Sequence, residues 1–127
     1  MERKTWTLDV VPDPNSNPEM EHPMSREKGN PLTFYGLMKL AEKHAVRFLK
    51  IMTCNNIGAP LGMGLWEGVP LRKVIWAARP KANIRRVFYY GHHNNDPKQM
   101  FRSSLPIGRV LEDPPWDNPV ILCYKLN

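Results

Sequence analysis

Proline is the residue that most restricts how this chain can fold. The 127 residues include 13 prolines, about twice the roughly 5% share of an average protein. They gather in two stretches: Pro12, Pro14, Pro18, Pro23 and Pro31, and later Pro114, Pro115 and Pro119. A fixed φ angle and a missing backbone donor oppose helices and strands there. Both stretches are therefore expected to be connections, in a chain whose length leaves room for one modest core.

The regular elements are expected outside these stretches. Alternating or apolar runs predict strands over residues 5–11, 45–53, 84–90 and 120–126, and the second run is apolar enough to be largely buried. Apolar spacings of three and four predict a helix over 33–43 with Thr33 as its cap, and another over 72–78 with Pro70 at the first helical position. A short helical turn is expected over 106–111. This order predicts an α+β fold, with a mixed sheet and short helices, and not a regular doubly wound fold.

Cys54 stands where the second of these strands is expected to end. Residues 55–64 follow with three glycines and a proline, which predicts a shaped loop whose backbone can approach a ligand. A rigid strand end can present a thiolate to a transition metal. The alternative is a small buried core residue, the more frequent state of a lone cysteine and the expected state of Cys123 in its apolar strand. The residue types alone leave both interpretations of Cys54 open.

The charge of the chain restricts its partners only weakly. A net charge of +6 and a pI near 9.6 suit a phosphorylated cofactor, an oxyanion substrate or a nucleic acid. The lysines and arginines are scattered and form no basic run, so nucleic-acid binding is not expected. The sequence contains no apolar stretch long enough for a membrane segment, and its first thirty residues lack a secretory signal. The chain as given is therefore expected in the cytoplasm, while a longer form with its own signal would suit the periplasm.

Four landmarks in the later part of the chain occur in an order that is more specific than any one motif. They are Cys54 followed by Trp66-Glu67-Gly68-Val69-Pro70-Leu71, the strand 87–91 with Asp96-Pro97, the step Ser104-Leu105-Pro106-Ile107, and Leu122-Cys123-Tyr124-Lys125-Leu126-Asn127. These landmarks resemble the sulfite oxidase family. The first is similar to the family's metal-binding cysteine and the stretch with tryptophan, glycine and proline-leucine that follows it, and the second to the family's next strand and loop. The third is similar to a serine-isoleucine-proline step, and the fourth to a strand that ends in leucine-alanine-tyrosine-glutamate-methionine-asparagine. The resemblance covers roughly residues 45–127.

The resemblance implies a molybdopterin-binding oxidoreductase domain. The family's pyranopterin cofactor carries molybdenum, which takes two sulfurs from the pterin and one from the cysteine that matches Cys54. The reaction moves an oxygen atom between a small-molecule substrate and water, and two electrons pass onward, for example to a redox partner protein. Cys54 is thus the expected catalytic residue and metal ligand. Cofactor contacts are expected from strand-end loops, where Asn55, His92, His93, Asn94, Arg102, Ser103 and Ser104 lie.

Four of these residues are selected as cofactor-binding: Asn55, His93, Arg102 and Ser104. Arg102 and Ser104 are preferred because a guanidinium and a hydroxyl suit phosphate oxygens. Zinc at the adjacent histidines is not expected, since no second closely spaced ligand pair accompanies them.

Departures from the family pattern limit what the resemblance implies. The sulfite-oxidising branch follows its cysteine with glycine-asparagine-arginine, whereas Asn55-Asn56-Ile57-Gly58 supplies no arginine, so sulfite is not assumed as substrate. Residues 1–30 are expected to be an N-terminal strand and proline-rich connection, and residues 31–127 a molybdopterin-binding domain that lacks its C-terminal part. The alternative function is a non-catalytic basic binding module, or an inactive fragment that keeps the family fold and binds an anionic partner.

Overall fold

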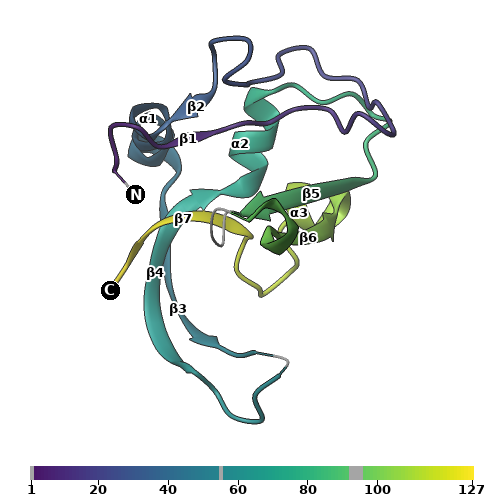
Figure 1. The fold of residues 1–127 in the computed structure, drawn as a ribbon. Coiled ribbons are helices and arrows are strands. Elements are labelled where there is room, and N and C mark those ends of the chain that lie inside the picture. The colour runs from purple at the N-terminus through teal and green to yellow at the C-terminus, as the bar shows by residue number, and fades with distance from the viewer. Residues whose placement is uncertain (1, 55, 92–95) are drawn as a thin grey trace.

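A computed structural model describes residues 2–54, 56–91 and 96–127 of the chain. Within these ranges, small antiparallel sheets are accompanied by short helices (Figure 1). One sheet pairs β1 (Thr7–Leu8) with β2 (Leu32–Thr33), a second has the order β3 (Val46–Met52), β4 (Gly62–Pro70) and β7 (Ile121–Leu126), and a third pairs β5 (Arg86–Gly91) with β6 (Phe101–Pro106). The helices are α1 (Phe34–His44), α2 (Leu71–Ala77), α3 (Ile107–Leu111) and the 3-10 turn η1 (Pro97–Gln99). The expected α+β class with short helices is confirmed.

The hydrophobic core lies where α1 and α2 pack on the inner end of β4. Its buried members come from nearly the whole length of the chain: Val10, Leu32, Leu37, Ala41, Val69, Val74, Ile75, Ala78 and Val110. Val87 and Leu105 pack against this cluster from the β5–β6 hairpin. A single core therefore holds the sheets and helices together.

Helix α1 begins and ends close to the prediction. Thr33 has extended backbone angles, and its Oγ1 accepts a hydrogen bond of 3.1 Å from the backbone N–H of Gly36, which satisfies one of the free donors of the first turn. Leu37 and Ala41, four residues apart, face the core. The cap and the apolar stripe expected from the sequence are both confirmed.

Helix α2 begins at Leu71, between the predicted first position at Pro70 and the predicted range 72–78. Pro70 is the N-cap and not the first helical residue, because it still belongs to β4 and pairs with Ile121 of β7. The N–H of Leu71 donates to the carbonyl oxygen of Val120 at 2.7 Å, so the first helical donor is used by the strand connection. Val74 and Ile75 form the buried stripe.

The N-terminal segment has less strand than predicted. β1 has only two residues of the expected 5–11 run, and beyond it Val10 forms an isolated antiparallel bridge with Met24. The proline-rich stretch continues as turns over the body of the molecule, where Met20 bridges to Pro80 and Asn30 Oδ1 accepts from the N–H of Ser25 at 3.1 Å. Among the described residues, no helix is long and apolar enough to cross a membrane.

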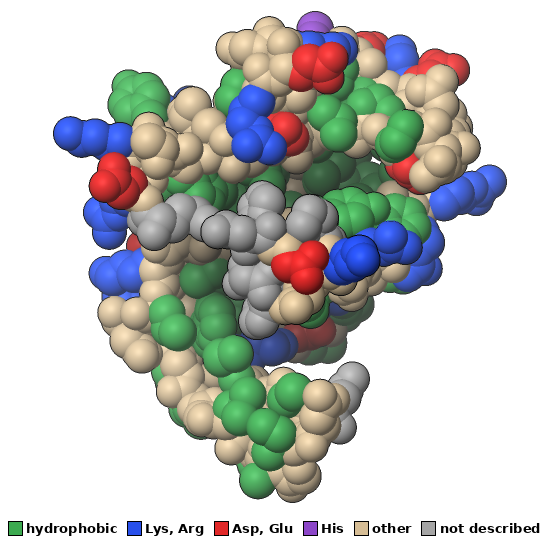
Figure 2. Space-filling model, viewed as in Figure 1, with side chains coloured by type: hydrophobic (Ala, Val, Ile, Leu, Met, Phe, Trp, Pro, Cys, Tyr) green, Lys and Arg blue, Asp and Glu red, His purple; other side chains and the backbone are tan. Residues whose placement is uncertain are grey.

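The hairpin formed by β3 and β4 extends away from the core (Figure 1). β7 pairs with β4 only from Trp66 to Pro70, so residues 49–54 and 56–65, which we call the outer arm, form a ribbon of two strands and the described part of their connection. The prediction of a largely buried strand was wrong, since β3 is mostly exposed from Leu49 to Met52. The apolar residues are those of a buried strand, but none of the described helices covers this part of the sheet. Figure 2 shows hydrophobic side chains along the outer arm.

The glycine-rich segment after Cys54 is not loop throughout, because β4 already begins at Gly62. Gly62 has a φ angle of +142°, which side chains rarely tolerate. At Gly64 a Cβ atom would lie 2.6 Å from Cδ1 of Leu126. These glycines let β4 start and let Leu126 pack across the strand, which the local sequence pattern could not reveal.

From β4 onward, two strands were not predicted from the sequence, β4 itself and β6. β5, α3 and β7 lie where the sequence placed a strand, a helical turn and a final strand, and these predictions are confirmed. β6, however, occupies residues that were expected to form a loop. Its register pairs Arg86 with Pro106 and Gly91 with Phe101, which makes β5 and β6 a hairpin.

Candidate functional site

Cys54 lies just beyond the end of β3, in the loop of the outer arm. The hairpin is closed there by backbone hydrogen bonds from Leu61 N to Met52 O at 2.8 Å and from Ile57 N to Cys54 O at 3.1 Å. The thiol is half-buried and outside any disulfide. Cys54 is thus an accessible thiol on a turn that its own backbone helps to close.

An open groove of about 420 Å³ runs beside this end of β3. One wall is formed by residues that share a face of β3 and β4, since Phe48 pairs with Trp66 and Lys50 and Met52 alternate with it along the strand. The opposite wall is the chain leading into β7, and α3 contributes one arginine: the residues there are Arg109, Asn118, Pro119, Val120, Ile121 and Cys123. Thr53, the neighbour of Cys54, closes the lining. The groove is apolar with two cationic side chains, Lys50 and Arg109.

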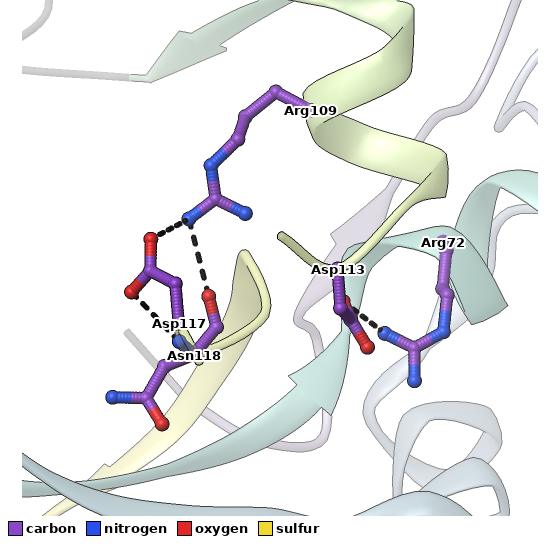
Figure 3. A network of polar contacts seen from close by, with 5 residues as sticks. All are labelled: Arg72, Arg109, Asp113, Asp117 and Asn118. Atoms are coloured by element: carbon purple, nitrogen blue, oxygen red, sulfur yellow. Dashed lines mark hydrogen bonds and ion pairs between the residues drawn. The ribbon is translucent and has the colours of Figure 1, made fainter. Parts of the chain in front are cut away.

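Two arginines bind the two ends of the proline-containing loop 113–118, which leads to the groove wall opposite β3 and β4 (Figure 3). From α2, Arg72 Nη1 donates to Asp113 Oδ1 at 2.7 Å. From α3, Arg109 Nη2 donates to Asp117 Oδ2 at 3.3 Å and to the carbonyl oxygen of Asn118 at 3.1 Å. These charge-assisted contacts hold the loop against the helices. The loop therefore forms a defined wall of the groove.

Arg109 has a donor that this network does not use. Its Nη1 is buried and lacks a hydrogen-bond partner among the described residues. A buried guanidinium nitrogen without a partner is costly in a folded protein. Arg109, in the wall of the groove, can therefore still donate a hydrogen bond from Nη1 to an acceptor.

Cys123 was expected to be buried, but it is half-buried and lines the groove. Leu122 and Tyr124 on either side pack against the core, so the alternation of the strand directs Cys123 to the other face of the sheet. Its Sγ donates to the carbonyl oxygen of Lys125 at 3.2 Å. Cys123 therefore differs from Cys54 in having its thiol hydrogen engaged by the strand.

Arg102 and Ser104 lie within β6 and not in a strand-end loop. Ser104 Oγ accepts two hydrogen bonds from the guanidinium of Arg86, at 2.8 Å from Nη2 and 3.2 Å from Nε. Arg102 is exposed and pairs with Tyr90 across the hairpin. Neither residue lines the groove beside Cys54. Their location was wrongly predicted because β6 was not recognised, while their role toward a cofactor stays a prediction.

The remaining predicted contacts, Asn55, His92, His93 and Asn94, lie outside the described residues. Lys50 and Arg109, the cations that line the groove, were not singled out from the sequence. Lys50 had a usable signal, because strand alternation puts it on the same side as Phe48 and Met52. Arg109 had none, since its place at the groove depends on how α3 packs.

Another polar contact lies on the core-facing side of the β3–β4–β7 sheet. The hydroxyl of Tyr124 donates to Glu67 Oε1 at 2.8 Å, and Arg47 Nε lies 3.9 Å from Glu67 Oε2. Burial, followed by the hydrogen bond to the Glu67 carboxylate, raises the pKa of Tyr124 to about 12. The tyrosine is therefore a neutral donor over the physiological pH range.

Comparison with known proteins identifies the family. Residues 24–127 match the family model described as the oxidoreductase molybdopterin binding domain. None of the curated proteins matches the chain. The match spans β2 to β7, including Cys54, the groove and the Tyr124–Glu67 pair. The resemblance drawn from the four sequence landmarks is confirmed, and the chain belongs to the oxidoreductase molybdopterin-binding domain family.

Proposed function

We propose that the chain holds a molybdenum–pterin cofactor through the thiolate of Cys54 and takes part in oxygen-atom transfer to or from a small molecule. The observation that carries this proposal is the free, half-buried thiol of Cys54 at a strand end, beside a groove that contains two cations. Membership of a molybdopterin-binding oxidoreductase family supports it.

The donor set near Cys54 fits such a cofactor. Within the described residues, no group of three or more His, Cys, Asp or Glu side chains is arranged to hold a metal ion. A cofactor that brings sulfur ligands of its own needs only one soft ligand from the protein, and an accessible thiolate is suited to a transition metal. Cys54 meets that requirement, whereas the Cys123 thiol is hydrogen-bonded within its strand.

The cofactor, when bound, supplies a two-electron centre at which oxygen is exchanged between substrate and water. The chain's own residues supply position and charge. Lys50 and Arg109 would attract anionic groups into the groove, and Trp66 and Phe48 would exclude water from its apolar wall. Arg102 and Ser104 on β6 stay our predicted contacts to a phosphate. Substrate and redox partner are proposed only as classes, a small molecule and an electron acceptor.

Metal content tests the proposal. The chain is produced in a host that makes the pterin cofactor, beside Cys54→Ser and the matched control Cys123→Ser, and molybdenum and pterin are measured on each purified protein. Near-stoichiometric metal is expected in the parent and in Cys123→Ser, and none in Cys54→Ser. Equal metal in both variants would exclude Cys54 as the ligand. Metal in none of the three would favour the non-catalytic binding module.

A further inference from the structure

Strand β3 has an edge that no other described strand pairs with. In the described residues its sheet has the order β3, β4, β7, so β3 pairs with β4 on one side only. Leu49 is 63% exposed and Ile51 49% exposed on this strand. Exposed apolar edge strands are templates for pairing with another strand, and proteins commonly protect them with charge, proline or cover.

The backbone groups that face this open edge can be identified. The N–H and the carbonyl oxygen of Leu65 on β4 are both bonded to Asn127, on the β7 side, at 3.0 and 2.8 Å. Leu65 is opposite Leu49, so these two residues form a pair without mutual hydrogen bonds. The N–H and carbonyl of Leu49 therefore point to the open edge, and by alternation those of Arg47 and Ile51 do too.

We propose that two copies of this chain pair antiparallel through the open edges of β3, with Leu49 opposite Leu49 of the second copy. This register aligns the outward backbone groups of both strands, as a two-fold interface requires. It joins the two sheets and brings the exposed apolar residues of both arms together.

The charges on β3 favour this register for a chain with a net charge of +6. With Leu49 at the centre, Arg47 lies opposite Ile51 of the second copy, and Lys50 lies opposite Phe48. No two cations are directly opposed, so the pairing avoids the cost of like charges facing each other across strands. A two-stranded ribbon is marginally stable in water, so the outer arm gains most from a third and fourth strand.

Position 51 gives a test of the register. Ile51→Lys puts a lysine opposite Arg47 at both ends of the interface, and Ile51→Glu puts a carboxylate there. Met63→Lys is the matched control, because Met63 is 62% exposed on the same face but lies on β4, away from the open edge of β3. Molar mass is measured by sedimentation velocity over a range of protein concentrations, and circular dichroism checks the fold of each variant.

The parent chain is expected to reach twice its 14.7 kDa mass. Met63→Lys should do the same, Ile51→Glu should stay dimeric with an affinity that falls as salt is added, and Ile51→Lys should be monomeric. A monomeric parent at all concentrations overturns the proposal. So does an Ile51→Glu variant as monomeric as Ile51→Lys, because unspecific apolar association would respond equally to both charges. An amide of Leu49 that exchanges as fast in the dimer as in the monomer also overturns it.

Discussion

The hydroxyl of Tyr124 is the single group whose removal can be predicted most directly. It donates to Glu67 at 2.8 Å in a partly buried position. Tyr124→Phe keeps the ring but leaves the carboxylate with one partner fewer, so we expect the free energy of unfolding to fall by about 1–2 kcal/mol. Urea denaturation measures it. Tyr35→Phe, at a residue 71% exposed, should stay within about 0.5 kcal/mol of the parent. Equal losses of unfolding free energy in the two variants would show that the hydrogen bond from Tyr124 to Glu67 does not stabilise the fold.

The same residue gives the fold a pH dependence on the alkaline side. The pKa of Tyr124 rises from 10.0 to about 12 in the folded chain, chiefly through burial. A group whose pKa is raised by folding stabilises the folded state fully below its unfolded pKa, and loses that contribution as pH rises through the folded pKa. Between pH 10 and 12 the parent should therefore lose stability faster than Tyr124→Phe. Parallel curves of unfolding free energy against pH would show that folding does not raise the pKa of Tyr124.

Single residues also show what the sequence could and could not predict about the site. The place of Cys54 just after a strand was predictable from a strand pattern followed by glycines, while its role as a ligand stays a prediction. The place of Ser104 was not predictable, because a run of two serines gives no sign that Arg86 on the preceding strand β5 donates hydrogen bonds to it. Arg109 lies at the groove because of how α3 packs, and there it contacts Asp117 and Asn118. Contacts between different elements are what local patterns omit.

Among the elements, the junction of β4 and β7 depends most on one glycine. A Cβ atom at Gly68 would lie 2.5 Å from the carbonyl oxygen of Leu122 and 2.9 Å from Cα of Cys123. Both are backbone atoms, so Gly68→Ala must shift β7, and we expect a loss of about 1–3 kcal/mol in unfolding free energy. At Gly58 an added Cβ meets nothing within 4 Å, so Gly58→Ala is the control. Thermal or urea unfolding of both variants measures the difference, and a harmless Gly68→Ala would mean that β7 packs less closely.

Strand β3 shows why burial is harder to predict than element type. Its apolar residues on both faces are typical of a strand covered on both sides, and the strand itself was predicted within one residue at each end. Its exposure arises from its position, since β7 reaches β4 only from Trp66 onward. Local pattern determines which residues can form a strand, while the neighbours of that strand are set by distant parts of the chain.

At the level of the whole molecule, segments that are far apart in the sequence share one hydrophobic core. Val10 from the first thirty residues shares one cluster with Val74 of α2 and Val110 of α3. The backbone of Val10 is also fixed, with hydrogen bonds to and from Met24 at 2.8 and 2.9 Å. These contacts predict that the N-terminal segment unfolds together with the rest.

Adjacent valines allow a test of this cooperativity. Val10 is 8% exposed, whereas Val11 is 48% exposed. Val10→Ala leaves a cavity in the shared core and should lower the free energy of the one unfolding transition by about 1–3 kcal/mol, as Val74→Ala should. Val11→Ala should change it by less than about 0.5 kcal/mol. Fluorescence and far-ultraviolet circular dichroism should report the same midpoint for each variant. If Val10→Ala leaves that transition unchanged while Val74→Ala lowers it, the first thirty residues fold as a separate unit, and the boundary expected at residue 30 is a real one.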